Sequence, residues 1–198
     1  MHVKIGSITV YISFSFAVFL AVAANIAGGR NLLLSFLFSF IHEAVHLIFL
    51  YFSGIKKAEI KLYPAGIKIC CMGMNMLSYR KTVLAALSAP VFNLFAGAVF
   101  FLLHKLFEKE VLYVCCAVNF ILGAINLFPL SFLDGGRTLH AVLSERLSYD
   151  RVSAIMNVLD IWSLAFLFVL FFAGLLMGKV WFFLLFFCVY CLTGTLKY

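Results

Sequence analysis

The sequence is short of charge: Asp, Glu, Lys and Arg make up 12% of its 198 residues, against about 25% in a typical soluble domain. Hydrophobic residues make up 65%, which excludes a soluble protein and predicts a polytopic membrane protein. The chain also lacks repeats, linkers and low-complexity segments, so we expect one membrane-embedded domain over residues 1–198. The net charge of +7 does not indicate nucleic acid, because the basic residues lie between apolar runs, where they set membrane topology.

The six cysteines lack the paired spacing of a zinc ribbon, and the chain is too long for a small disulfide scaffold. Cys115, Cys116, Cys188 and Cys191 lie in apolar runs, where we expect small, buried, hydrophobic side chains. A redox pair of Cys188 and Cys191 is the alternative.

Six apolar runs predict an all-α polytopic membrane protein with about six transmembrane helices. The first run could also be a signal peptide, but its length and weak positive flank favour an uncleaved span. The runs cover about 5–27, 32–52, 83–103, 111–128, 152–177 and 180–196.

The polar stretch between the second and third runs alternates apolar and charged residues on either side of Pro64-Ala65-Gly66. This pattern predicts a small β-hairpin that lies at the membrane interface or against the helices. Six spans would place both termini on the hairpin's side, together with most of the 15 Lys and Arg residues. The positive-inside rule then predicts a multi-pass protein of the cell membrane, with both termini and the hairpin in the cytoplasm.

Within the second run, the sequence reads His42-Glu43-Ala44-Val45-His46. Residues four apart share one face of a helix, so both imidazoles can bind one metal ion, with Glu43 beside them. Ionisable groups at membrane depth are costly, which favours a functional role over a chance match. The pattern predicts one zinc ion (Zn2+) per chain, with Glu43 as the general base that takes a proton from the attacking water.

A catalytic zinc site needs a third protein ligand. Asp134 is the strongest candidate, because it follows Pro129 at the broken end of the fourth run and precedes two glycines that allow close backbone approach. Asp160, within the fifth run, is expected to pair with Arg151 or Asn157. The other acidic residues lie in connecting stretches or at the start of a span: Glu59, Glu108, Glu110, Glu145 and Asp150.

Asn93 follows Ser88-Ala89-Pro90 inside the third run and needs a polar partner there. The partner is either another helix or a ligand. A short amphipathic helix is expected over about 137–151, after the segment that carries Asp134.

HEAVH, the following hairpin, Ser88-Ala89-Pro90-x-x-Asn93 and Asn126-x-x-Pro129-x-x-x-Leu133-Asp134-Gly135 follow one another in this order along the chain. These motifs resemble the site-2 protease family of intramembrane zinc metalloproteases, in order and in spacing. The layout is similar to the compact bacterial branch that includes the sporulation protease processing a pro-sigma factor. The resemblance covers a core of residues 31–148, while the first span and the last two spans (about 152–196) are supported by span count alone.

The resemblance implies that His42, His46 and Asp134 ligate zinc, and that Glu43 is the catalytic base. It also implies that Asn93 and Asn126 hold the substrate backbone. The expected function is intramembrane hydrolysis of a peptide bond in or near a transmembrane segment of a membrane-anchored protein, such as a pro-sigma factor or another regulator. The expected partners are that substrate, the lipid bilayer and regulatory membrane proteins, with no nucleic acid.

Two other functions compete with the enzyme. One is a catalytically inactive adaptor that binds membrane helices without cutting them. The other is a metal transporter, which would place ligand groups at several depths along a path, whereas here the candidate ligands converge on one point.

Overall fold

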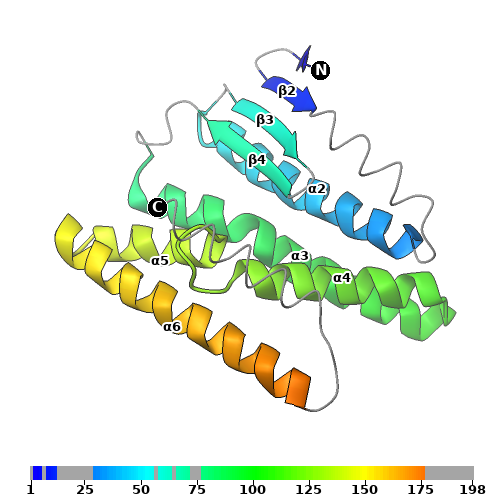
Figure 1. The fold of residues 1–198 in the computed structure, drawn as a ribbon. Coiled ribbons are helices and arrows are strands. Elements are labelled where there is room, and N and C mark those ends of the chain that lie inside the picture. Colours follow the sequence, from blue (N-terminus) through cyan, green and yellow to red (C-terminus); the bar gives the residue numbers. More distant parts are fainter. Residues whose placement is uncertain are drawn as a thin grey trace. The chain divides into compact units, whose positions relative to one another are not determined.

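The computed structural model describes residues 2–5, 8–12, 29–55, 58–63, 66–71 and 77–176. The chain divides into two compact units, which cover residues 1–124 and 125–198. Figure 1 shows the helices and strands of each unit along the chain.

In the first unit, four strands form one sheet in the order β1 (His2–Ile5), β2 (Ile8–Ile12), β3 (Ala58–Tyr63) and β4 (Gly66–Cys71). The pairs β1–β2 and β3–β4 are antiparallel, whereas β2 and β3 run parallel. Parallel neighbours require a crossover connection. Helix α2 (Gly29–Phe52) lies within this crossover, and β4 packs alongside it (Figure 1).

The sequence predicts a helical span over about 5–27, and this prediction is wrong for residues 8–12. Residues 8–12 form β2, and Ile8 pairs with Ala58 of β3. The segment Ile-Thr-Val-Tyr-Ile consists of β-branched and aromatic residues, which favour a strand where a partner strand is available. A short apolar run of this kind cannot be distinguished from a helix by hydropathy alone. Residues 13–27 of the predicted span lie outside the described residues.

Strands β3 and β4 occupy the stretch in which the sequence predicts a hairpin, and they pair with Glu59 opposite Cys70. Pro64 and Ala65 of the predicted turn lie outside the described residues. The stretch is therefore part of a larger sheet that also includes the N-terminal strands.

Three helices among the described residues are long and apolar enough to cross a membrane: α2, α3 (Tyr79–Phe107) and α6 (Tyr149–Leu176). They correspond to the second, third and fifth predicted runs. The fourth run forms the shorter apolar helix α4 (Glu110–Asn126), whose last two residues belong to the second unit. The chain is thus a mostly helical membrane protein. The sixth run, 180–196, lies outside the described residues.

Small side chains bring the helices of the first unit close together. Helix α3 buries Ala85, Ala86 and Ala89, and it packs against α2. A Cβ atom on Gly97 would lie 3.1 Å from the ring of Phe120 on α4. Glycine and alanine allow backbones in a membrane to approach closely, so side chains from one helix reach the backbone of the next.

The second unit contains α5 (Asp134–Ser144) and α6, preceded by the loop 127–133. The loop supplies Leu130 and Leu133, which form a buried cluster with Leu167 of α6. The amphipathic helix predicted over about 137–151 is therefore present as α5, although it starts earlier, at Asp134 itself.

Candidate metal centre

Helix α2 presents His42 and His46 on one face, as the spacing of four residues predicts. Both are buried, with 3% and 8% of their surface exposed, and their ring centroids lie 4.9 Å apart. Glu43 lies between them on the same helix and is half-buried. Two buried imidazoles on successive turns provide nitrogen ligands at a spacing suited to a single metal ion.

The ring of His46 is held by the backbone of α3. Its Nδ1 lies 2.8 Å from the carbonyl oxygen of Ala85, which also accepts a hydrogen bond from Ser88 Oγ at 2.7 Å. A carbonyl oxygen can only accept, so Nδ1 of His46 carries the proton and donates it. The lone pair then lies on Nε2, the nitrogen that a metal ion needs.

The ring of His42 is held by a side chain of α3. Its Nδ1 lies 2.9 Å from Asn93 Oδ1, and Asn93 is 1% exposed. Asn93 thus makes the interhelical hydrogen bond that the sequence left open as an alternative to a ligand.

Asp134 is the first residue of α5 and is buried. A carboxylate is favoured at a helix N-terminus, where backbone N–H groups point outward. One turn later, Arg137 Nη1 lies 3.7 Å from Asp134 Oδ1, and its side chain is 52% exposed. The arginine therefore pairs with the carboxylate from the more exposed side of the helix.

The two residues after Asp134 must be glycine for the helix to start here. A Cβ atom on Gly135 would overlap the carbonyl group of Leu127, and one on Gly136 would overlap the carbonyl group of Leu130. The first turn of α5 is thus pressed against the backbone of its own preceding loop, which restricts where the Asp134 side chain can lie.

The same loop is tied to α6 by a carboxylate that the sequence assigned differently. Asp160 accepts two hydrogen bonds from Ser131, one from the backbone N at 2.8 Å and one from Oγ at 2.7 Å. The expected partners Arg151 and Asn157 do not take this role, because Ser131 reaches Asp160 from a residue 29 positions earlier in the chain.

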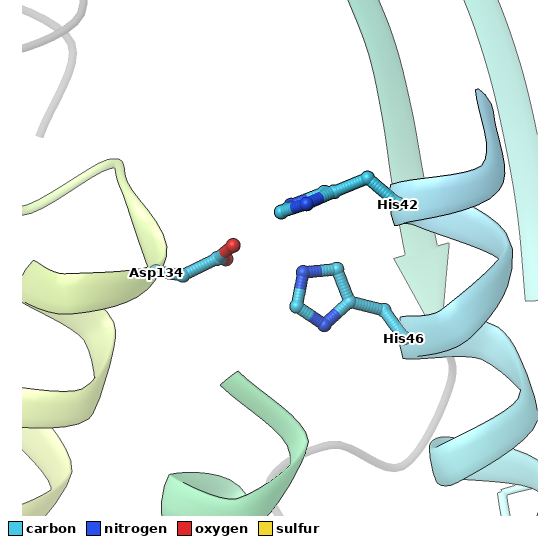
Figure 2. A group of neighbouring side chains, drawn as sticks. All are labelled: His42, His46 and Asp134. Atoms are coloured by element: carbon cyan, nitrogen blue, oxygen red, sulfur yellow. The ribbon is translucent and has the colours of Figure 1, made fainter. Parts of the chain in front are cut away.

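Among the described residues, one group of potential metal ligands consists of His42, His46 and Asp134. Each is buried and offers one ligand atom; the two histidines lie in the first unit and Asp134 lies in the second. Figure 2 labels these three side chains, with both imidazole rings on α2 and the Asp134 carboxylate on α5. Two imidazoles and a carboxylate are a donor set that zinc accepts in catalytic sites.

The remaining sequence candidates lie elsewhere. Asn126, at the end of α4, is half-buried. Cys115 and Cys116 are free and buried, as expected for small hydrophobic side chains, whereas Cys188 and Cys191 lie outside the described residues. The other acidic residues with described side chains are exposed: Glu108, Glu110, Glu145 and Asp150.

Sequence reasoning missed two polar residues that bear on the site, Ser131 and Asn119. Asn119 lies in α4, is completely buried and contacts Asn93. The position of Asn119 inside an apolar run could have identified it, because an amide at membrane depth requires a hydrogen-bond partner.

Comparison with known proteins identifies relatives of this chain. Residues 103–170 match the model of Peptidase family M50, a stretch that contains Asp134. A curated zinc metalloprotease from Methanocaldococcus jannaschii is 27% identical over 158 residues, which cover 74% of this chain. The chain spans about half the length of that relative (46%).

A solved structure has the same fold. The site-2 protease from Methanocaldococcus jannaschii matches with a TM-score of 0.72 and 22% identity, covering 100% of this chain and 94% of that one.

Proposed function

We propose that this chain is a site-2 protease, that is, an intramembrane zinc metalloendopeptidase; the match to Peptidase family M50 and the zinc metalloprotease relative support this. The observation that carries the proposal is the pair of buried imidazoles of His42 and His46 on α2, whose ring centroids lie 4.9 Å apart. We propose Asp134, the buried first residue of α5, as the third ligand. The substrate class we propose is a membrane-anchored protein cut in or near its transmembrane segment.

The donor atoms of His42, His46 and Asp134 are of the kinds that bind zinc. The Nδ1 atom of each imidazole faces an acceptor oxygen, so the ligand lone pair lies on Nε2 in both rings. Asp134 adds an oxygen donor from a buried position. Three protein ligands are the number found in catalytic zinc sites, since such sites keep a position open for water or substrate.

When bound, zinc would supply a Lewis acid for the substrate carbonyl and favour hydroxide at neutral pH. Glu43 would act as the general base, taking a proton from the attacking water and returning it to the leaving amine. Its place between the two histidines on α2 supports this role, because it lies beside the rings without being one of the three proposed ligands.

A transmembrane substrate must lose its helical hydrogen bonds before a peptide bond can reach the site. Asn126, half-buried at the end of α4, is our candidate for binding the extended backbone. Strand addition at the free edge of β4, one of the two outer strands of the described sheet, would compensate the exposed peptide groups. Asn93 is better placed to orient His42 than to bind substrate, because it is buried and bonded to the ring.

The multi-pass arrangement with cytoplasmic termini also remains a proposal. The distribution of Lys and Arg supports it, as do the three helices long enough to span a bilayer. Reporter fusions at both ends of the chain would test it.

The deciding experiment compares membrane proteomes of cells that produce the wild-type chain or Glu43→Gln. A membrane protein should accumulate uncut in Glu43→Gln cells and be cleaved in wild-type cells. Glu145→Gln, which changes an exposed acidic residue near the end of α5, is the matched control and should cleave normally.

The outcomes distinguish the competing functions. Zinc bound at one equivalent, with cleavage lost in Glu43→Gln, supports the protease. Zinc bound with no cleaved protein found in wild-type cells would favour the inactive adaptor. Metal flux in proteoliposomes would favour a transporter.

A further inference from the structure

Asn119 is the most enclosed polar residue of α4. Its residue surface is 0% exposed, and it lies near the middle of an apolar helix. Its Nδ2 donates to the backbone carbonyl of Cys115 at 2.8 Å, while its Oδ1 accepts from Asn93 Nδ2 at 3.2 Å. Both ends of this amide are therefore occupied within the first unit.

The direction of this chain of hydrogen bonds is fixed at one end by the backbone. The Cys115 carbonyl can only accept, so the group of Asn119 that faces it must be the NH₂ group. The Asn119 oxygen then faces Asn93, which must donate its own NH₂ group. The Asn93 oxygen is left to face His42, so Nδ1 of His42 must carry the proton.

The two histidines thus reach the same tautomer by different routes. His46 donates directly to a backbone carbonyl of α3, a partner whose orientation is set by the helix. His42 donates to an amide that could present either its oxygen or its nitrogen if it stood alone. The orientation of that amide is determined by Asn119, which is itself determined by Cys115.

We propose that Asn119 is a positioning residue: through Asn93 it fixes the tautomer and ring orientation of His42, so that Nε2 is available as a ligand. This inference rests on the proposed function, in which His42 binds zinc. It adds α4 to the helices that build the site, although α4 contributes no ligand. Groups that orient a metal-bound histidine typically affect metal affinity 10–100-fold.

The test measures zinc affinity of the full-length chain in detergent by competition with a chelator. Asn119→Leu, which keeps the branching at Cγ but removes both hydrogen bonds, should weaken zinc binding about 10–100-fold. Cys116→Ala, at a neighbouring buried position of α4, is the control for altered packing and should bind zinc nearly as the wild type does. Equal zinc affinity in Asn119→Leu and Cys116→Ala would overturn the proposal.

A double variant separates this pathway from a general loss of packing. Because Asn119 acts through Asn93, Asn93→Leu with Asn119→Leu should bind zinc no more weakly than Asn93→Leu alone. Additive losses would show that Asn119 acts by another route. Asn119→Asp keeps an oxygen that can accept from Asn93, and it should recover part of the affinity lost in Asn119→Leu.

A second readout does not depend on the variants being folded. In the wild-type zinc-bound chain with ¹⁵N-labelled histidine, the ring-nitrogen NMR signals should show His42 with a protonated Nδ1 and a metal-bound Nε2. A metal-bound Nδ1 at His42 would contradict the proposal. If His42→Ala retains full zinc affinity, the proposed zinc site is wrong; if it loses zinc while Asn119→Leu does not, only the positioning role is wrong.

Discussion

The contact between Ser131 and Asp160 should hold the loop that leads into Asp134. Ser131 donates two short hydrogen bonds to this one buried carboxylate, from its backbone N and from Oγ. A hydrogen bond to a charged group typically contributes about 1.5–3 kcal/mol. Ser131→Ala removes the Oγ bond and keeps the backbone bond, so we expect it to lower the free energy of unfolding by about that amount.

Asp160→Leu should be more damaging than Ser131→Ala. It removes both acceptor oxygens and leaves the Ser131 N–H and hydroxyl without the group they donate to. In a domain of about 200 residues, each kcal/mol corresponds to roughly 2–4 °C in Tm. The expected order of melting temperature is wild type, then Ser131→Ala, then Asp160→Leu.

Two measurements check this prediction. Thermal unfolding in detergent gives the order of stability, and hydrogen exchange reports the Ser131 amide directly, which should exchange faster in Asp160→Leu. Ser163→Ala, at a buried serine of α6, is the matched control and should leave the Ser131 amide protected. If the Ser131 amide exchanges at the wild-type rate in Asp160→Leu, Asp160 does not hold the loop, even if the melting temperature falls.

Three further predictions concern the site. Glu43→Gln should keep zinc and lose cleavage by about 10²–10⁴-fold, the usual contribution of a general base, and a wild-type cleavage rate would exclude Glu43 from this role. Gly135→Ala should lower the free energy of unfolding by about 1–3 kcal/mol, because the added carbon overlaps the Leu127 carbonyl. Gly97→Ala is the control, since the atoms nearest to its added carbon belong to the Phe120 side chain. Thermal unfolding should show a larger loss of stability for Gly135→Ala than for Gly97→Ala. Removing the metal with a chelator should stop cleavage, and added zinc should restore it. Added magnesium should not restore cleavage, because two imidazole ligands suit zinc whereas magnesium prefers oxygen ligands. Restoration by magnesium would contradict the proposed donor set.

Local chemistry explains which parts of the site could be predicted from the sequence. The shared face of His42 and His46 follows from helix geometry alone, which does not depend on what the helix packs against. Asp134 stood out because Pro129 and the following glycines mark a sharp break in an apolar run. The structure places Asp134 at the first position of α5, with Gly135 and Gly136 against the loop backbone.

The parts that sequence reasoning missed depend on contacts distant in the chain. Residues 8–12 form a strand because a partner at residues 58–62 lies beside them, and hydropathy carries no information about that pairing. Asp160 bonds to Ser131 rather than to a neighbour on its own helix. Asn119 could be recognised as costly in an apolar helix, but its link to His42 passes through Asn93, and only the packing of the helices reveals it.

The most direct test of the central claim is the zinc content of Asp134→Ala measured against that of the wild-type chain. The account predicts about one zinc ion per wild-type chain, and a large loss of zinc affinity when the carboxylate ligand is removed. Asp134→Ala that binds zinc as tightly as the wild type would contradict the proposal that His42, His46 and Asp134 hold one ion together.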